Sequence, residues 1–189
     1  MKKKILNDGC MRTIIGGPTH QLRDPIPPGG AGTSCFHEET MIVTNNGSKM
    51  IKNIDLTIDK IWNPINQKWM ELSRKTVTLW QGEVCKIATS ENELITTSNH
   101  PFMLKDGTVL KAENLEVGDV LDNGSEGIVI KAMQLNKVQE YVIVHNLVFK
   151  NAGTADCEHF VEANGIPSGI LHLQDKVANA SLTKALQLN

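Results

Sequence analysis

The chain has 189 residues, of which 40% are hydrophobic and 21% are charged, and its formal net charge is −2. This ordinary composition allows one good hydrophobic core, so we expect one domain with short appendages. The mixed charges give no reason to expect nucleic acid or a membrane surface as a partner, and no stretch is apolar enough to span a membrane.

The first residues do not form a readable secretory signal. Three lysines at positions 2–4 are followed by Asn7, Asp8 and Arg12, which interrupt any apolar segment. A cytoplasmic location is therefore the default expectation. The cysteines Cys10, Cys35, Cys85 and Cys157 lie far apart and form no CxxC pair, which favours separate, reduced thiols.

Residues 1–34 are predicted to be a flexible upstream segment. They contain GG, PIPPGG and GAG but little periodic hydrophobicity. At Cys35 the sequence changes character, because GTSCFHEETMIV runs from this glycine-rich segment directly into a predicted strand.

Residues 35–169 are predicted to form an all-β domain. Short apolar runs with near-alternation, such as EVCKIATS, ELITTS and EYVIVHNLVF, are separated by the turn dipeptides Asn46-Gly47, Asp106-Gly107, Asn123-Gly124 and Asn164-Gly165. The segments 46–54 (NGSKMIKNI) and 106–115 (DGTVLKAENL) resemble each other, and each precedes an aspartate, Asp59 or Asp119. This similarity indicates a duplicated architecture or two ordinary hairpins. The tail 170–189 is richer in helix formers, with Asp175 as a candidate N-cap of a short helix.

Three segments carry candidate chemistry. A thiol at Cys35 is a good nucleophile at neutral pH, but attack on a carbonyl also needs a proton carrier and a positioned oxyanion. In TTSNHPF (96–102), Thr97 and His100 lie three residues apart in a predicted turn. The His100 imidazole can protonate a leaving amide nitrogen there, or His100 can be a purely structural turn residue. In CEHFVEANGI (157–166), His159 precedes a final strand and can equally be incidental.

Taken together and in this order, the segments resemble the hedgehog/intein (Hint) family of self-processing domains. Cys35-Phe36 with Thr40 is similar to the family's opening motif, and TSNHPF to its TxxH block. DGTVLKAENLEVGDVL is similar to the following block, and VHNLVF with HFVEANGI to the closing strands. Among the members, the chain is most similar to bacterial-intein-like or other non-splicing Hint domains.

The resemblance implies a compact, horseshoe-like all-β fold with two related halves and the nucleophile at its first residue. It further implies that the Cys35 thiol attacks the carbonyl of Ser34, so that the upstream segment becomes a thioester. His100 would protonate the Cys35 nitrogen, and Thr97 would hold or polarise the Ser34 carbonyl.

The closing segment departs from the intein pattern of a penultimate His, a terminal Asn and a following Cys, Ser or Thr. ANGI is followed by PSGIL, so ordinary splicing is not expected. His159 is a further candidate catalytic residue, and Asn146 and Asn164 are candidate supporting residues. Asn146 stands where the family often has an aspartate, and an uncharged amide is not a base. We regard the pair His145-Asn146 itself as structural.

We therefore expect single-turnover self-processing in cis that releases residues 1–34 to water, a thiol or an amine, with a monomeric chain and no cofactor. A metal site of Cys157, Cys35 and His100 lacks a second paired ligand, so no metal is expected. The alternatives are a catalytically silent binding or spacer module, an intein-like splicing element and a trans-acting cysteine hydrolase.

Overall fold

The computed structural model of the chain describes residues 10–15, 35–174 and 176. The strands of the first half and the long connecting strand are β1 (Cys10–Ile15), β2 (Phe36–His37), β3 (Met41–Thr44), β4 (Gly47–Met50), β5 (Lys60–Asn63) and β6 (Lys68–Trp80). The later strands are β7 (Glu83–Ala88), β8 (Glu93–Thr97), β9 (Pro101–Met103), β10 (Val109–Lys111), β11 (Val120–Leu121), β12 (Ile128–Val129), β13 (Ala132–Lys137), β14 (Val142–Phe149), β15 (Phe160–Ala163) and β16 (Ile166–Gly169).

Helical structure is limited to short segments in the described residues. Three 3-10 helices are present, η1 (Ile51–Asn53), η2 (Ala112–Asn114) and η3 (Asp156–Glu158), and residues 171–174 form a helical turn. The prediction of an all-β fold with a short C-terminal helix is confirmed. The helix begins before Asp175, and the rest of the predicted helix lies outside the described residues.

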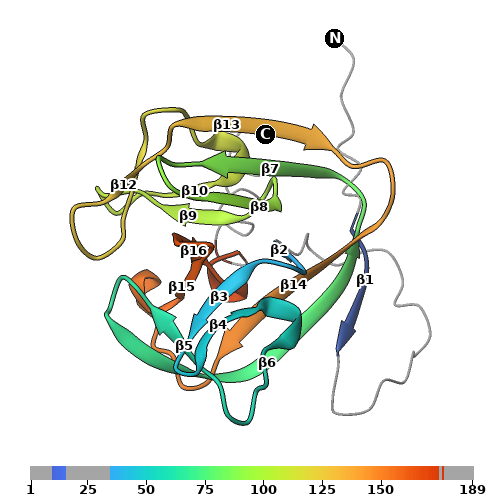
Figure 1. The fold of residues 1–189 in the computed structure, drawn as a ribbon, viewed down its shortest axis with the longest axis vertical. Helices are drawn as coiled ribbons and strands as arrows, with labels where there is room; N and C mark the ends of the chain where they lie inside the picture. The colour runs from blue at the N-terminus through green and yellow to red at the C-terminus, as the bar shows by residue number, and fades with distance from the viewer. Residues whose placement is uncertain (1–9, 16–34, 175, 177–189) are drawn as a thin grey trace, which may run out of the picture.

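One large bent sheet organises the molecule. Its strand order is β13-β7-β8-β2-β14-β6-β5-β3-β15-β16, with β1 added to β6 and β4 added to β3. Figure 1 shows β7, β8 and β13 in one arm and β3, β5 and β6 in the other, which gives the horseshoe-like shape that the resemblance implies. The short strand β2 lies between β8 and β14, so the chain enters the sheet at its centre.

In the first half, a tight turn after β2 is tied to η1 by main-chain hydrogen bonds. The Thr40 N–H donates to the His37 carbonyl at 3.0 Å, and the Ile51 N–H donates to the Thr40 carbonyl at 2.8 Å. The Ile54 N–H then closes η1 by donating to the Ile51 carbonyl.

In the second half, the same bonds recur after β8. The His100 N–H donates to the Thr97 carbonyl at 3.1 Å, and the Ala112 N–H donates to the His100 carbonyl at 2.7 Å. The Leu115 N–H closes η2 by donating to the Ala112 carbonyl. The segments 46–54 and 106–115 therefore belong to two related halves, and the turn 97–100 is the counterpart of the turn 37–40.

The four predicted turn dipeptides all lie at turns that need a left-handed backbone. Their glycines, listed with φ, are Gly47 (+90°), Gly107 (+86°), Gly124 (+72°) and Gly165 (+74°). Gly124 also packs closely against another loop, because a Cβ atom there would lie 2.5 Å from the carbonyl oxygen of Pro64. Backbone freedom and close approach both require glycine at this position.

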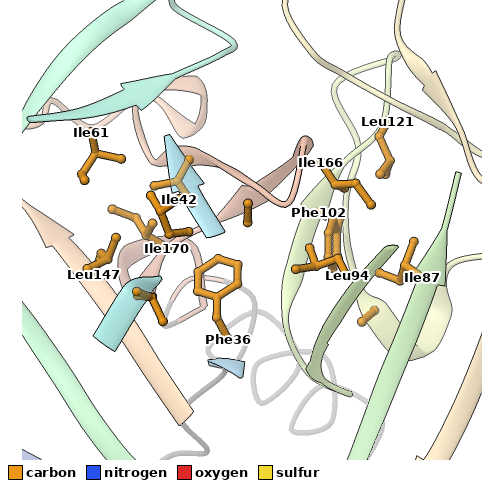
Figure 2. Packing of buried hydrophobic residues seen from close by; sticks show 14 of the residues in the cluster. Phe36, Ile42, Ile61, Ile87, Leu94, Phe102, Leu121, Leu147, Ile166 and Ile170 are labelled. Atoms are coloured by element: carbon orange, nitrogen blue, oxygen red, sulfur yellow. The ribbon is translucent and has the colours of Figure 1, made fainter. Parts of the chain in front are cut away.

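The hydrophobic core joins the two halves and supports β2. Phe36, fully buried, lies between Ile42 and Leu147 on one side and Leu94 and Phe102 on the other (Figure 2). The core therefore anchors the residue directly after Cys35. No helix among the described residues has the length and apolar character needed to cross a membrane.

The upstream segment contains regular structure that we did not predict. Strand β1 lies within residues 1–34 and pairs antiparallel with β6. Its sequence, CMRTII, lies between the turn dipeptides Asp8-Gly9 and Gly16-Gly17, but its six residues do not alternate between apolar and polar, so periodicity alone did not reveal it. Of the three tryptophans, Trp80 is buried, whereas Trp69 is 46% exposed.

Candidate functional site

Cys35 lies directly before β2 and is fully buried. It packs in a small apolar cluster with Trp80 and Val144. This is neither a disulfide-type position nor a surface thiol, and Cys85 and Cys157 elsewhere carry free thiols. The enclosure means that a nucleophile from solvent reaches Cys35 only if it is small or if this part of the fold opens.

Thr97 makes direct contact with the main chain of Cys35. The Cys35 N–H donates to the Thr97 hydroxyl oxygen at 2.9 Å, and the Thr97 N–H donates to the Cys35 carbonyl at 3.1 Å. We expected Thr97 to hold or polarise the Ser34 carbonyl, and Ser34 lies outside the described residues. Within the described residues, the Thr97 hydroxyl holds the amide nitrogen of Cys35, which would be the leaving group if the bond before Cys35 were cleaved.

Asn99 fixes the orientation of the Thr97 hydroxyl, and sequence analysis did not single it out. The hydroxyl proton is donated to Asn99 Oδ1 at 2.8 Å, which leaves an oxygen lone pair for the Cys35 N–H. The signal that was available is the Asn two residues after Thr97 in TTSNHP, because asparagine side chains commonly close such turns.

Asn146 lies next to Cys35 across the sheet. Phe36 pairs with His145 of β14, so extending the register by one residue places Cys35 beside Asn146, which in turn pairs with Thr76 of β6. Neighbours of this kind have Cβ atoms about 5 Å apart on the same face. Asn146 is fully buried, and its Oδ1 accepts the Leu147 N–H at 2.7 Å. The structure thus brings Thr97, Cys35 and Asn146 into one row.

His100 is fully buried between two phenylalanines. Its ring centroid lies 4.3 Å from that of Phe36 and 5.3 Å from that of Phe102. Within the described residues neither ring nitrogen has a hydrogen-bond partner of good geometry. Burial lowers the pKa of His100 to about 3, and the backbone of Gly169 opposes this shift only in part. His100 is therefore neutral at neutral pH.

His159 lies at the closing end of the domain. Its Nε2 contacts the Gly153 carbonyl oxygen at 2.9 Å, its ring stacks on His172 with centroids 3.9 Å apart, and its carbonyl accepts the Ile170 N–H. Burial lowers its pKa, the Gly153 carbonyl opposes the shift, and His172 adds to it. These contacts connect His159 to the chain that follows β16, and none of them joins it to Cys35.

Asn164 connects parts of the two halves. Its Oδ1 accepts the Met41 N–H at 2.7 Å, and its Nδ2 donates to the Glu93 carbonyl at 2.9 Å. It occupies the left-handed turn between β15 and β16, with φ of 48°. Its contacts support the scaffold that carries β8 and β3, and they do not reach the Cys35 thiol.

His145 is a second buried imidazole near Phe36. It is 5% exposed, and its ring nitrogens have no hydrogen-bond partner in the described part of the chain. Burial first, and then the positive charges of Lys75 and Lys52 together with His37, lower its pKa to about 4. From the sequence we predicted a structural role for His145, and in the sheet it pairs with Phe36.

No metal or open catalytic cleft is found at these residues. Among the described residues, no group of three or more His, Cys, Asp or Glu side chains is arranged to hold a metal ion. A pocket of about 290 Å³ lies elsewhere, lined by residues such as Trp62, Asn123 and Glu162. None of the candidate catalytic residues Cys35, Thr97, His100 and His159 lines it.

The fold matches solved structures of self-processing domains. A bacterial intein-like domain from Clostridium thermocellum superimposes with a TM-score of 0.61 and 25% identity, over 72% of this chain and 97% of that one. The MchDnaB-1 intein gives 0.58 and 16%, over 71% and 98%, and a DnaB intein from Synechocystis sp. PCC 6803 gives 0.56 and 18%, over 73% and 99%. No protein-family model and no curated protein matches the chain.

These findings show that the chain has the fold of intein-like and intein domains, the fold that the resemblance to the hedgehog/intein (Hint) family implied. It is similar both to a bacterial intein-like domain and to DnaB inteins. The resemblance that the sequence motifs indicated is confirmed at the level of the fold.

Proposed function

We propose that this domain cleaves its own chain between Ser34 and Cys35 through a thioester and does so once per molecule. The observation that supports this best is the hydrogen bond from the Cys35 N–H to the Thr97 hydroxyl, inside a buried site at the first residue of the domain. It holds the nitrogen that must leave, in a chain whose fold is that of self-processing domains.

The first step is an N-to-S acyl shift. The Cys35 sulfur attacks the carbonyl carbon of Ser34, a carbon–sulfur bond forms, and the carbon–nitrogen bond breaks. The thiol proton ends on the Cys35 nitrogen, so the step is balanced without any co-reactant. The Thr97 hydroxyl, already bonded to this nitrogen, continues to accept a hydrogen bond from the amine that forms.

His100 is the proposed proton carrier. Burial lowers its pKa to about 3, so the resting ring is neutral and a poor base. We propose that the negative charge developing on the tetrahedral intermediate raises this pKa, so that the ring then carries the thiol proton to the departing nitrogen. A positioned acid matters here because an amide nitrogen leaves poorly unless it is protonated.

The second step transfers the acyl group from Cys35 to water, a thiol or an amine. A thioester is higher in energy than the amide it replaces, so capture of the acyl group or of the freed amine drives the reaction forward. Since Cys35 is fully buried, small nucleophiles are favoured. The released upstream segment gains one water in hydrolysis, and the Cys35 thiol is regenerated.

We further propose that the closing end is not cleaved. The hairpin of β15 and β16 ends at Gly169, and Ile170 follows, so no cyclising asparagine stands at this junction. Ile170 and Leu173 are fully buried, and Leu173 packs with Met103 and Phe160. Residues 170–174 are therefore packed into the folded domain, and we propose that they remain attached to it.

Intact-mass measurement of the purified full chain tests the proposal. With dithiothreitol or hydroxylamine at neutral pH, we expect fragments corresponding to residues 1–34 and 35–189. Cys35→Ala is expected to stay whole. Cys85→Ala is the matched control, because Cys85 is also buried but lies on β7 and is expected to cleave normally.

The same measurement separates the alternatives. A wild-type chain that stays intact with both nucleophiles would show a catalytically silent module. A ligated product that joins the flanks of the domain would identify splicing. Repeated turnover on an added peptide would identify a cysteine hydrolase, which the enclosed position of Cys35 disfavours.

A further inference from the structure

Three buried hydrogen-bond donors lie on alternate residues of β6. Thr76, Thr78 and Trp80 are 2%, 0% and 6% exposed, and within the described residues the hydroxyls and the indole Nε1 have no hydrogen-bond partner. A buried donor that stays unpaired destabilises the fold. Because side chains at alternate strand positions point to the same face, the three donors share one face.

This face is the one that carries Cys35. Thr76 pairs with Asn146, which lies beside Cys35 in the extended register of β2 and β14. Independently, Trp80 packs in the same apolar cluster as Cys35 and Val144. The unpaired donors therefore line the approach to the nucleophile.

The edge of the same stretch of β6 is taken by the upstream segment. Strand β1 pairs antiparallel with β6, from Cys10 opposite Trp80 to Ile15 opposite Thr76, with an irregularity between Met11 and Thr13. Strand β14 occupies the other edge of β6. An open strand edge is a template for one more extended chain, and here the upstream segment itself fills it.

We propose that residues 76–80 of β6 are the docking site for the segment that precedes Cys35. The free edge of β6 pairs with the main chain of residues 10–15. The side-chain hydroxyls of Thr76 and Thr78 and the indole N–H of Trp80 donate hydrogen bonds to main-chain carbonyls of the segment that leads into Cys35. Recognition through main-chain atoms accepts extended peptides of many sequences. This deepens the proposed function, on which it rests, by assigning the residues that hold its substrate.

Docking has a direct consequence for the reaction. After the acyl shift the upstream segment is attached to Cys35 only through the thioester, and docking along β6 holds its acyl end near the site until that bond is resolved. Once the acyl group has been transferred, the segment is no longer covalently attached but stays bound along β6, so it leaves slowly.

Retention is tested without relying on self-processing. A protease site is inserted between Ile15 and Cys35 in the full Cys35→Ala chain, the chain is cut, and the fragments are analysed by size exclusion and native mass spectrometry. We expect the upstream fragment to co-elute with the domain. The double substitution Thr13→Pro and Ile14→Pro is expected to release it. Neighbouring strand residues direct their N–H groups to opposite edges of the strand, so one of the two N–H groups that are removed faces β6 and its hydrogen bond to β6 is lost.

The donors are tested by Thr76→Val with Thr78→Val in the same cut chain. We expect the upstream fragment to dissociate about tenfold faster or more, since two hydrogen bonds are lost. The matched control is Thr96→Val, because Thr96 is equally buried with an unpaired hydroxyl but pairs with Phe36 and so faces the opposite side of the sheet. Thr96→Val is expected to leave dissociation unchanged.

Two results would overturn the docking site. One is a fragment that separates immediately from the cut chain without the proline substitutions, and the other is equal dissociation in the Thr76/Thr78 variant and the Thr96 control. If the cut Cys35→Ala chain retains the fragment while the wild-type chain never cleaves with dithiothreitol, self-processing is refuted and docking is left intact.

Discussion

A single hydroxyl group, that of Thr97, connects Cys35 to its neighbours. Thr97 accepts from the Cys35 N–H and donates to Asn99, so its one proton and one of its lone pairs are both committed. This arrangement fixes the amide nitrogen before any reaction takes place. A residue that only filled space at position 97 would leave that buried N–H without an acceptor.

Thr97→Val removes the acceptor and keeps the volume. We expect thiol-induced cleavage to slow by at least tenfold, and folding stability to fall by about 1–3 kcal/mol because the buried Cys35 N–H loses its partner. Quenched time courses give the rate, and urea unfolding in a Cys35→Ala background gives the stability. Cleavage at the wild-type rate would contradict a role for this hydroxyl.

At the scale of residues, the sequence motifs singled out Cys35 and the turn 97–100 but did not reveal the contacts between them. The spacing of Cys35, Thr97 and His100 in recognisable motifs was sufficient to select them. Asn99 was missed, and the hydrogen bond from the Cys35 N–H to the Thr97 hydroxyl was not predicted, because a motif carries residue types and not the direction of a hydroxyl lone pair. Only the pairing of Phe36 with Thr96 shows which atoms meet.

At the scale of elements, turns and hairpins were the most predictable part of the fold. Asn-Gly and Asp-Gly dipeptides correctly marked turns, because glycine adopts positive φ at low cost. Strand β1 was not predicted, since its pairing with β6 is a long-range contact that local pattern does not encode. The order of strands in the large sheet was likewise beyond local pattern.

Two turn glycines are expected to respond differently to substitution. Gly107→Ala meets no atom within 4 Å, so only the positive φ opposes it, at about 1–2 kcal/mol. Gly124→Ala adds a clash with the Pro64 and Ile65 carbonyl oxygens at 2.5 and 2.9 Å, which belong to the backbone and cannot turn away. Urea unfolding should show a clearly larger loss for Gly124→Ala. Equal losses would mean that the loop at 64–65 moves freely.

At the scale of the whole molecule, buried imidazoles make folding sensitive to acid. His145 and His100 have pKa values lowered to about 4 and about 3, mainly by burial, so the folded chain keeps both neutral. In the unfolded chain each binds a proton below about pH 6.5. Because the unfolded state then binds more protons, the free energy of unfolding falls as pH drops below 6.5 and continues to fall towards pH 4.

Urea unfolding of the Cys35→Ala chain between pH 7.5 and 4.5 measures this loss. Each fully neutral histidine contributes a slope of at most about 1.4 kcal/mol per pH unit. His145→Phe is expected to make the dependence shallower in the same range. Stability that stays constant from pH 7 to pH 5 would show that neither ring is held neutral by the fold.

The paired turns 37–40 and 97–100 share a backbone arrangement but carry different side chains. They share their main-chain hydrogen bonds, although no residue type agrees between His37, Glu38, Glu39, Thr40 and their counterparts Thr97, Ser98, Asn99, His100. The path of the backbone is thus independent of the side chains that it displays. A substituted Thr97 or His100 therefore remains on an intact frame, and reactivity lost in such variants reports on the missing functional group.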